Sequence, residues 1–330
     1  MLLPQGGPLE LPRSVLGVLL EFADHRSVHQ LEATSRHASA LIRATGFWRT
    51  TALKRMALHV HSEHDTGAGW KRLVCMATIP TQRDRNLLQD VYGCSSIDRP
   101  SESPSNTLVP SRCWLSMQRA LSLTSRLLSP DPSALQNLAN EAQIECGCET
   151  AACYWSSSPS PAKSSRDFIE YTTRTNCLVS AIQVLPYRAF WHPDSPTFAP
   201  QSVSFEFFAR QRQDVGGDRS CRFHASYKSN QMDVDDDSNS DMAAMLDKVK
   251  IYESPVYAMH NAMQLHEFAL PKKVWLAQGG TFRLNLLGRY QRETFEMPPW
   301  IPADEQEPAE PPYYCCLSFV NAVGVSYDYR

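Results

Sequence analysis

The first helical pattern in the chain, Ser14–Asp24, carries more apolar side chains than one packing face can hold. Its polar positions fall on one stripe at helical spacing, and apolar residues cover nearly all of the remaining circumference. These apolar residues are Val15, Leu16, Val18, Leu19, Leu20 and Phe22. Such a helix needs packing partners on two sides, so we expect it to lie between the rest of its own module and a second surface.

The helical pattern continues through a module that spans residues 9–56. Ser27 followed by Gln30 is a capping-box pattern that predicts a second helix. Ser35 begins a third helix, Gly46 is placed to end it, and a fourth follows. About fifty residues form a core that is too small to make the module stable on its own. We therefore predict that this module either docks on a partner or packs as a cap on the rest of the chain.

Composition restricts the partners and the compartment. The 330 residues carry a formal net charge of −3 without a long Lys or Arg run, which argues against nucleic acid or a membrane surface as a partner. The start lacks a signal-peptide pattern, and no stretch approaches the roughly 20 apolar residues of a membrane span. Ten cysteines without a single Asn-x-Ser/Thr sequon favour a reducing compartment. We expect a cytoplasmic or nuclear protein.

Residues 57–146 are predicted to be a helical spacer with a disordered linker. Trp70–Leu73 and Arg83–Tyr92 show helical spacing. Residues 95–112 are rich in serine and proline with almost no apolar residue, a composition that does not repay the entropy cost of ordering. Two weaker helical patterns follow between residues 113 and 143.

From about Ala151 the pattern changes from helical to alternating, and short runs of β-branched and aromatic residues are bounded by Pro, Gly and Asn. The predicted strand faces include Leu178/Ser180/Ile182/Val184, Val203/Phe205/Phe207 and Phe282/Leu284/Leu286. Consecutive strands without intervening helices indicate an antiparallel, jelly-roll-like β-sandwich over residues 147–330. The expected fold class is α+β.

No catalytic, cofactor or metal site is evident. The acidic run Met232–Asp241 has Ser238 and Ala244 where a calcium loop requires glycine and glutamate. The histidines near residue 60 and the cysteines near residue 150 lack the paired ligand sets of a structural zinc site. These residues are His59, His61, His64, Cys146, Cys148 and Cys153. Since no local signature places a nucleophile beside a base, we expect a non-catalytic protein that needs no cofactor and no metal.

Aromatic residues of the C-terminal half have two possible roles. Tyr154, Trp155, Phe190, Trp191 and Trp275 either line a carbohydrate or peptide pocket or fill the sandwich core. Two tryptophans follow strand or proline-rich segments at turns, where a ring is less often part of the core, and exposed tryptophans are common binding hot spots. We therefore name Trp191 and Trp300 as candidate target-binding residues.

The N-terminal module resembles an F-box. The resemblance rests on Leu11-Pro12, Val15, Leu16, Leu19, Leu20, Ser27-Val28, Leu31, Ser35-Arg36 and Trp48. It implies a module that docks on a Skp-type adaptor and thereby joins a cullin–RING ubiquitin ligase. The implied adaptor-binding residues are Leu11, Pro12, Val15, Leu16, Leu19, Leu20, Val28 and Leu31. The sequence departs from the pattern at Ala38, where F-boxes usually have tryptophan, and at Thr34, where they have valine.

The rest of the chain resembles a plant and green-algal group of F-box proteins with a β-rich, possibly galactose-binding-like, C-terminal domain. The matching segments are Cys153–Ser157, Asn176–Val179, Pro186–Phe190, Tyr252–Pro255, Leu286–Arg292 and Tyr313–Cys315. The resemblance implies a non-catalytic receptor whose sandwich binds an unknown protein target. The alternative is a carbohydrate-binding sandwich with a helical cap.

Overall fold

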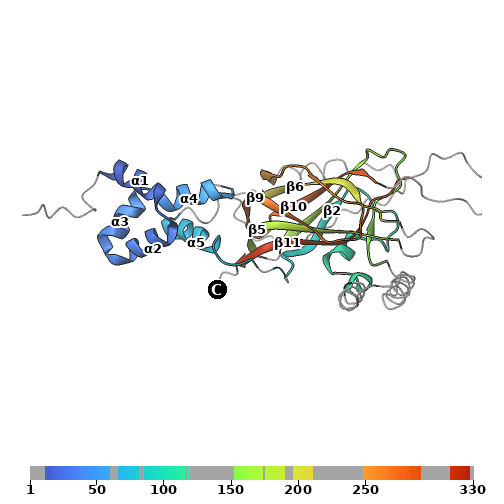
Figure 1. Cartoon of the computed structure of the whole chain (residues 1–330), viewed down its shortest axis with the longest axis horizontal. Helices are drawn as coiled ribbons and strands as arrows, with labels where there is room; N and C mark the ends of the chain where they lie inside the picture. The colour runs from blue at the N-terminus through green and yellow to red at the C-terminus, as the bar shows by residue number, and fades with distance from the viewer. Residues whose placement is uncertain are drawn as a thin grey trace, which may run out of the picture.

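The computed structural model describes residues 12–59, 66–81, 83, 85–115, 118, 152–173, 175–189, 196–210, 248–290 and 313–327. Helices occupy one end of the molecule and a β-sandwich the other (Figure 1). The α+β class and the antiparallel sandwich predicted from the sequence are confirmed. No helix in these ranges is both long enough and apolar enough to cross a membrane.

Local residues explain where the helices begin and end. The helices are α1 (Arg13–Phe22), α2 (His25–Thr34), α3 (Arg36–Ala44), α4 (Phe47–Arg55), α5 (Gly67–Met76) and the short 3₁₀ helix η1 (Pro104–Leu108). Asp24, rather than the predicted Ser27, caps α2, because its carboxylate accepts the backbone N–H groups of both Arg26 and Ser27. Ser35 caps α3, and Gly46 separates α3 from α4 at a φ of 70°, a conformation that favours glycine.

Two sheets pack face to face. The strands are β1 (Met56–Ala57), β2 (Leu88–Cys94), β3 (Trp155–Ser156), β4 (Arg166–Thr173), β5 (Asn176–Pro186), β6 (Pro200–Arg210), β7 (Lys248–Glu253), β8 (Tyr257–Ala258), β9 (His266–Leu276), β10 (Thr281–Arg289) and β11 (Cys316–Tyr327). Sheet A has the order β1-β9-β5-β11-β3, and sheet B has the order β2-β4-β10-β6-β7, with β8 also paired to β6. All pairs are antiparallel except β1 with β9.

The inward faces of β6 and β10 match the predicted alternation. Val203, Phe205 and Phe207 of β6 are fully buried between the sheets, as are Phe282, Leu284 and Leu286 of β10. Cys315 and Cys316 enter different clusters, as adjacent residues in an extended segment should.

The alternation predicted for β5 is confirmed for Ile182 and Val184, which face the inter-sheet core, but it is wrong at Leu178, because the strand contains a bulge between them. Pairing with β9 shifts register between Val179 and Ala181, so Val179 and Ile182 both face the inter-sheet core. Leu178 instead packs with the helices. On β11, Gly324 lies against this bulge, where a Cβ atom would overlap the carbonyl oxygen of Leu178.

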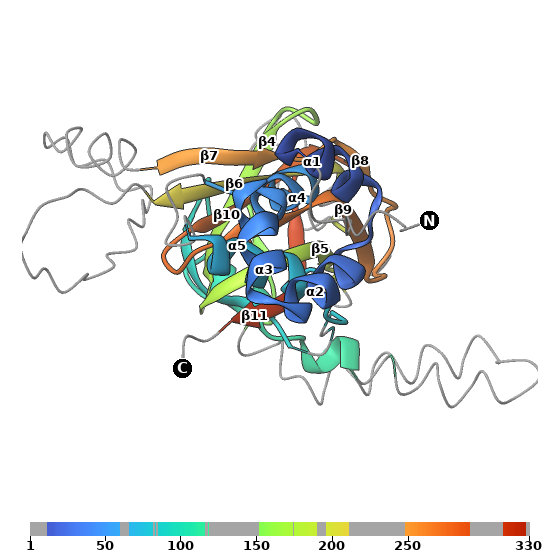
Figure 2. The same ribbon diagram turned by 90° about the vertical axis from the view of Figure 1, so that its left-hand side faces the viewer.

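The helices and the sandwich share one apolar cluster. Leu178, Trp275 and Val325 of sheet A pack with side chains from α1 to α5. The end of α4 runs directly into β1, whose Met56 and Ala57 pair with Lys273 and Val274 of β9. Figure 2 shows the helices in front of the sandwich end. The module is therefore packed on the sandwich rather than joined through a spacer.

The predicted disordered linker, residues 95–112, is ordered against the sandwich. Thr107, which is fully buried in η1, hydrogen bonds to Tyr171 of β4 at 2.8 Å. The side-chain amide of Asn106 donates to the carbonyl oxygens of Ser101 and Tyr154. Polar side chains thus add to the few apolar contacts, in which Ile97 and Leu108 pack against the inter-sheet core, and the prediction of disorder is wrong.

The predicted helix at residues 83–92 is also wrong, because this segment closes the edge of one sheet and enters the other. Asn86 acts as a strand partner for β11: its amide donates to Val320 O at 2.9 Å and its oxygen accepts Ala322 N–H at 3.2 Å. The chain then enters sheet B as β2, with Leu87 and Leu88 in the core. The sandwich therefore begins before the predicted boundary at residue 147.

The corrected boundary can be tested with two fragments. A fragment of residues 79–330 should be more stable than one of residues 147–330, because the shorter fragment lacks β2 and η1. Loss of the two buried leucines alone removes about 3–6 kcal/mol. Both fragments expose the same helix-facing side chains, so thermal unfolding followed by circular dichroism isolates the contribution of residues 79–146. Equal melting temperatures would contradict the assignment of β2 to the sandwich.

Candidate functional site

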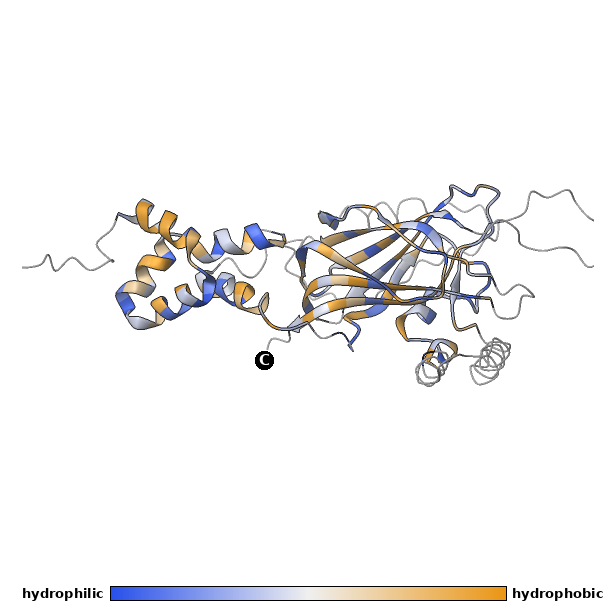
Figure 3. Cartoon of the chain, in the orientation of Figure 1, coloured by the Kyte–Doolittle hydropathy of each residue, from blue (hydrophilic) through white to orange (hydrophobic). Residues whose placement is uncertain are grey.

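The outer face of α1 is an exposed apolar stripe. Val15, Val18, Leu19 and Phe22 follow the spacing i, i+3, i+4 and i+7, and they are 43%, 57%, 51% and 86% exposed. Half of the eight large exposed apolar side chains in the described residues lie on this one helix. Figure 3 shows α1 apolar along its length at the outer end of the molecule. Contiguous exposed apolar residues of this kind mark interaction surfaces.

The opposite face of α1 holds the helix on the module. Leu16 and Leu20 are 6% and 4% exposed and pack with the buried residues of α2 to α5. Their i, i+4 spacing places them together on one side of the helix. Thus α1 has the two apolar faces that the sequence predicts, one satisfied within the chain and one open.

The predicted adaptor-binding residues divide between these two faces. Val15 and Leu19 lie in the open stripe, and Pro12 is exposed at the start of α1. Leu16, Leu20 and Val28 are core residues with little surface exposed to a partner, and Leu31 is partly buried in the same cluster. Direct contact of these four residues with an adaptor stays a prediction. Leu11 lies outside the described residues.

Two residues of the stripe, Val18 and Phe22, were not among the predicted binding residues. The helical spacing that links them to Val15 and Leu19 was available in the sequence. Choosing between two apolar faces of one helix, however, requires knowledge of which face the other helices cover.

A buried carboxylate fixes the helices beneath α1. Glu32 of α2, which is 7% exposed, accepts hydrogen bonds from Trp48 Nε1 at 3.2 Å and forms an ion pair with Lys71 Nζ at 2.8 Å. Arg43 lies 3.5 Å away. Burial acts to raise the pKa of Glu32, but the Lys71 ammonium, the Trp48 hydrogen bond and the Arg43 charge together lower it. One carboxylate thus links α2, α3, α4 and α5.

The departure from the F-box pattern at Ala38 falls in the core of the module. Ala38 is fully buried in α3, and its backbone N–H donates to Ser35 Oγ. Thr34 is exposed at the end of α2. The alanine therefore changes the packing of the module rather than the exposed stripe.

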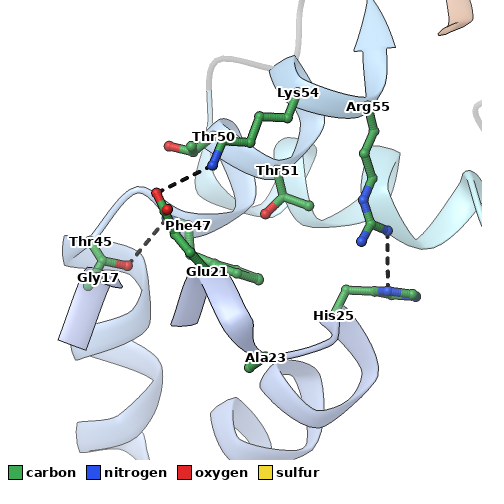
Figure 4. A pocket seen from close by; sticks show the side chains of 10 residues that line it. All are labelled: Gly17, Glu21, Ala23, His25, Thr45, Phe47, Thr50, Thr51, Lys54 and Arg55. Carbon is green, nitrogen blue, oxygen red and sulfur yellow. Dashed lines mark hydrogen bonds and ion pairs between the residues drawn. The ribbon is translucent and has the colours of Figure 1, made fainter. Parts of the chain in front are cut away.

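A cavity of about 170 Å³ lies beside the stripe, between α1, α4 and the turn that leads to α2. Figure 4 shows its polar lining: Lys54 reaches Glu21, and Arg55 reaches His25. Phe47 and Ala23 supply apolar lining. The cavity and the stripe share α1, because Gly17 and Glu21 line the first while Val18 and Phe22 belong to the second.

The two predicted target-binding tryptophans belong to the segments that follow strands β5 and β10. Trp191 and Trp300 lie outside the described residues, so their roles stay predictions. The described residues that flank these segments are hydrogen bonded: Ala189 N–H donates to Pro196 O, and Tyr290 N–H donates to Ala199 O. Of the predicted pocket aromatics, Tyr154, Trp155 and Trp275 are buried, as core residues would be. Phe190 also lies outside the described residues.

The described residues hold no group of three or more His, Cys, Asp or Glu side chains arranged to bind a metal ion. Burial raises the pKa of Cys94 to about 11 and those of Cys177 and Cys316 to about 12. These three thiols are therefore protonated near neutral pH, which makes them poor nucleophiles and poor metal ligands.

Comparison with known proteins gives only fold-level similarity. No protein-family profile and no curated protein matches the sequence. Among solved structures, chitosan-binding module 1 of a chitosanase/glucanase from Paenibacillus sp. IK-5 is 8% identical with a TM-score of 0.31, covering 72% of this chain and 97% of that module.

Two further solved structures are similar at the same low level. Reduced XRCC1 bound to the DNA pol beta catalytic domain is 10% identical, with a TM-score of 0.29 and coverage of 74% and 97%. The family 32 CBM from C. perfringens NanJ in complex with galactose is 6% identical, with a TM-score of 0.24 and coverage of 52% and 75%. The similarity is confined to the general β-sandwich architecture.

The role of Glu32 leads to a pH-dependent prediction. Because the pKa of Glu32 is lower in the folded protein than its usual 4.5, its ion pairs stabilise the fold above that value and lose their effect as pH falls through the folded-state pKa. Glu32→Gln should therefore lower the free energy of unfolding by about 1–3 kcal/mol at pH 7. The difference between wild type and variant should shrink as the pH of urea titrations falls below 4.5, and a difference independent of pH would argue against the ionic role.

Proposed function

We propose that this chain is a non-catalytic substrate receptor, in which the helical module docks on a Skp-type adaptor of a cullin–RING ubiquitin ligase and the sandwich binds a protein target. The single observation that carries the proposal is the open stripe of Val15, Val18, Leu19 and Phe22 on α1. It supports the docking role that the F-box resemblance implies for this helix.

The stripe has enough apolar surface to matter for binding. Fully burying one such side chain contributes about 1.5–3 kcal/mol, although association also costs rigid-body and side-chain entropy. Phe22, which is 86% exposed, has the most surface left to bury and is the expected hot spot. Four adjacent side chains on one rigid helix therefore suit a docking surface.

The arrangement of the two parts also fits a receptor. The stripe lies at the helical end of the molecule (Figure 1). Strand β11 runs toward that end, where its Val325 packs with the helices, so its antiparallel partner β5 ends at the opposite end of the sandwich. An adaptor on α1 would leave that opposite end open. Loops at one end of a β-sandwich are a common site of recognition.

The second candidate is the carbohydrate-binding sandwich that the sequence leaves open. Solved structures with this fold include modules described as binding chitosan or in complex with galactose, but a fold shared at this level does not assign a ligand. Tyr154, Trp155 and Trp275 are in the core, so a glycan would have to be bound by other groups.

The docking face can be tested by placing charge in the stripe. The double variant Val18→Asp/Phe22→Asp should weaken the affinity of the full chain for a purified Skp-type adaptor at least about 100-fold, because two apolar contacts are lost and two carboxylates must be desolvated. The matched control is Val109→Asp/Val256→Asp, which changes side chains that are 69% and 61% exposed elsewhere. Calorimetry gives the affinity, and circular dichroism verifies folding.

The outcome separates a docking surface from an ordinary exposed patch. Unchanged affinity of the folded stripe variant would contradict the proposal, as would equal losses in the stripe and control variants. Substituting Leu20 would not serve the same purpose, because that residue is buried and its change would disturb the core of the module.

Glycan binding gives the discriminating prediction for the second candidate. If the chain is a receptor for a protein target, the full chain should not bind any glycan of a glycan array above background. A carbohydrate-binding sandwich should retain a defined set of glycans, and the retention should persist in the Val18→Asp/Phe22→Asp variant because the helices would not take part. Reproducible retention of one glycan class would favour the second candidate.

A further inference from the structure

The cavity beside α1 has a lining that suits a carboxylate. Lys54 Nζ lies 3.4 Å from Glu21 Oε1, and Arg55 Nη1 lies 3.4 Å from His25 Nδ1. Figure 4 shows Thr51 between these two pairs. Two permanent cations and an imidazole thus border the cavity, against the single carboxylate of Glu21.

The Lys54–Glu21 pair is open to rearrangement. The two side chains are 62% and 53% exposed. Exposed ion pairs of this kind contribute little, typically about 0–1 kcal/mol. A carboxylate that enters the cavity can therefore replace Glu21 as the ion-pair partner of Lys54 with little loss of stability. It can also accept a charge-assisted hydrogen bond from Arg55.

The whole helical module has a strong positive bias that the full chain lacks. Helices α1 to α5, with the Asp24 cap between α1 and α2, contain nine Lys or Arg residues and three Asp or Glu residues, whereas the complete sequence contains 32 and 35. Of the three acidic residues, Glu32 is buried and already paired with Lys71, and Asp24 is engaged in capping α2. The surface around the stripe therefore complements an acidic partner and disfavours a basic one.

We propose that the partner that docks on the α1 stripe inserts an Asp or Glu side chain into the cavity formed by α1, α4 and the α1–α2 turn, where Lys54 and Arg55 hold it. The inference rests on the proposed function, in that the same partner covers Val18 and Phe22. It adds a polar anchor to the apolar contact, which fixes the orientation of the partner on the helix.

His25 provides an internal reporter for this event. Burial and then the charge of Arg55 lower the pKa of His25, while Asp24 acts against them; Arg26 and His29 are the other charged or titratable neighbours. A carboxylate beside the imidazole favours its charged form. The pKa of His25, followed by NMR, should therefore rise when the cavity is filled.

The test compares two exposed arginines of the same module in the full chain. Arg55→Gln should weaken affinity for the purified Skp-type adaptor at least about 5-fold at low salt, whereas Arg36→Gln, which makes the same charge change outside the cavity, should change it less than about 2-fold. Lys54→Gln is a second cavity variant that leaves the Arg55–His25 contact in place. Circular dichroism verifies that each variant is folded.

Acetate serves as an independent carboxylate probe. In the wild-type full chain, sodium acetate should shift the NMR signals of His25 relative to sodium chloride at the same ionic strength. The shift should be absent from Arg55→Gln if that cation holds the anion.

The outcomes distinguish the cavity from the docking surface. If Arg55→Gln and Arg36→Gln lowered the affinity for the adaptor equally, long-range electrostatic attraction would explain the effect, and the inference would be overturned. The stripe variants could still support the proposed function. If wild-type protein bound no adaptor, the proposed function would fail, and the acetate titration would decide the cavity on its own. No acetate-dependent shift would overturn the cavity site.

Discussion

The packing of Trp275 and Leu178 against the helices is the constraint on which the rest of the molecule depends. Both residues belong to sheet A, yet they join the apolar cluster of the helical module. The parallel pairing of β1 with β9 continues the same joint through the backbone. Because this end of the sandwich is covered by the module, α1 is held in place, and its second face stays exposed. The exposed stripe is thus part of a single packed unit.

Local periodicity predicts the strands whose geometry is regular. The alternating residues of β6 and β10 lie where the sequence places them, because neither strand is bulged over its core positions. In β5 the same argument holds for Ile182 and Val184 but fails at Leu178, because a bulge beside Gly324, a residue far along the chain, lies between them. Spacing within one strand contains no information about a glycine in its neighbour. The face occupied by Leu178 could therefore not be read from its own segment.

The prediction of disorder for residues 95–112, which rests on composition, fails for a different reason. Few apolar residues imply disorder only when the polar groups gain nothing on folding. Here the Thr107 hydroxyl bonds to the buried Tyr171 phenol, and the Asn106 amide satisfies main-chain carbonyl groups. Buried hydrogen bonds of this kind repay part of the ordering entropy because their loss would leave buried polar groups without partners. Serine, threonine and asparagine are frequent in disordered segments, and they are also well suited to complete irregular edges of a sandwich.

The candidate site shows how far an apolar excess can be interpreted from sequence. Helical spacing establishes that α1 has two apolar faces. The predicted adaptor-binding residues, however, include Val15 and Leu19 from the exposed face and Leu16 and Leu20 from the buried face. The choice between faces is made by α2 to α5, whose own apolar residues must be covered at the same time. Once they cover Leu16 and Leu20, a large aromatic side chain at Phe22 is left in water. Phe22 adds nothing to the core that the structure describes, and the docking role proposed for α1 is the one that would use its exposed surface.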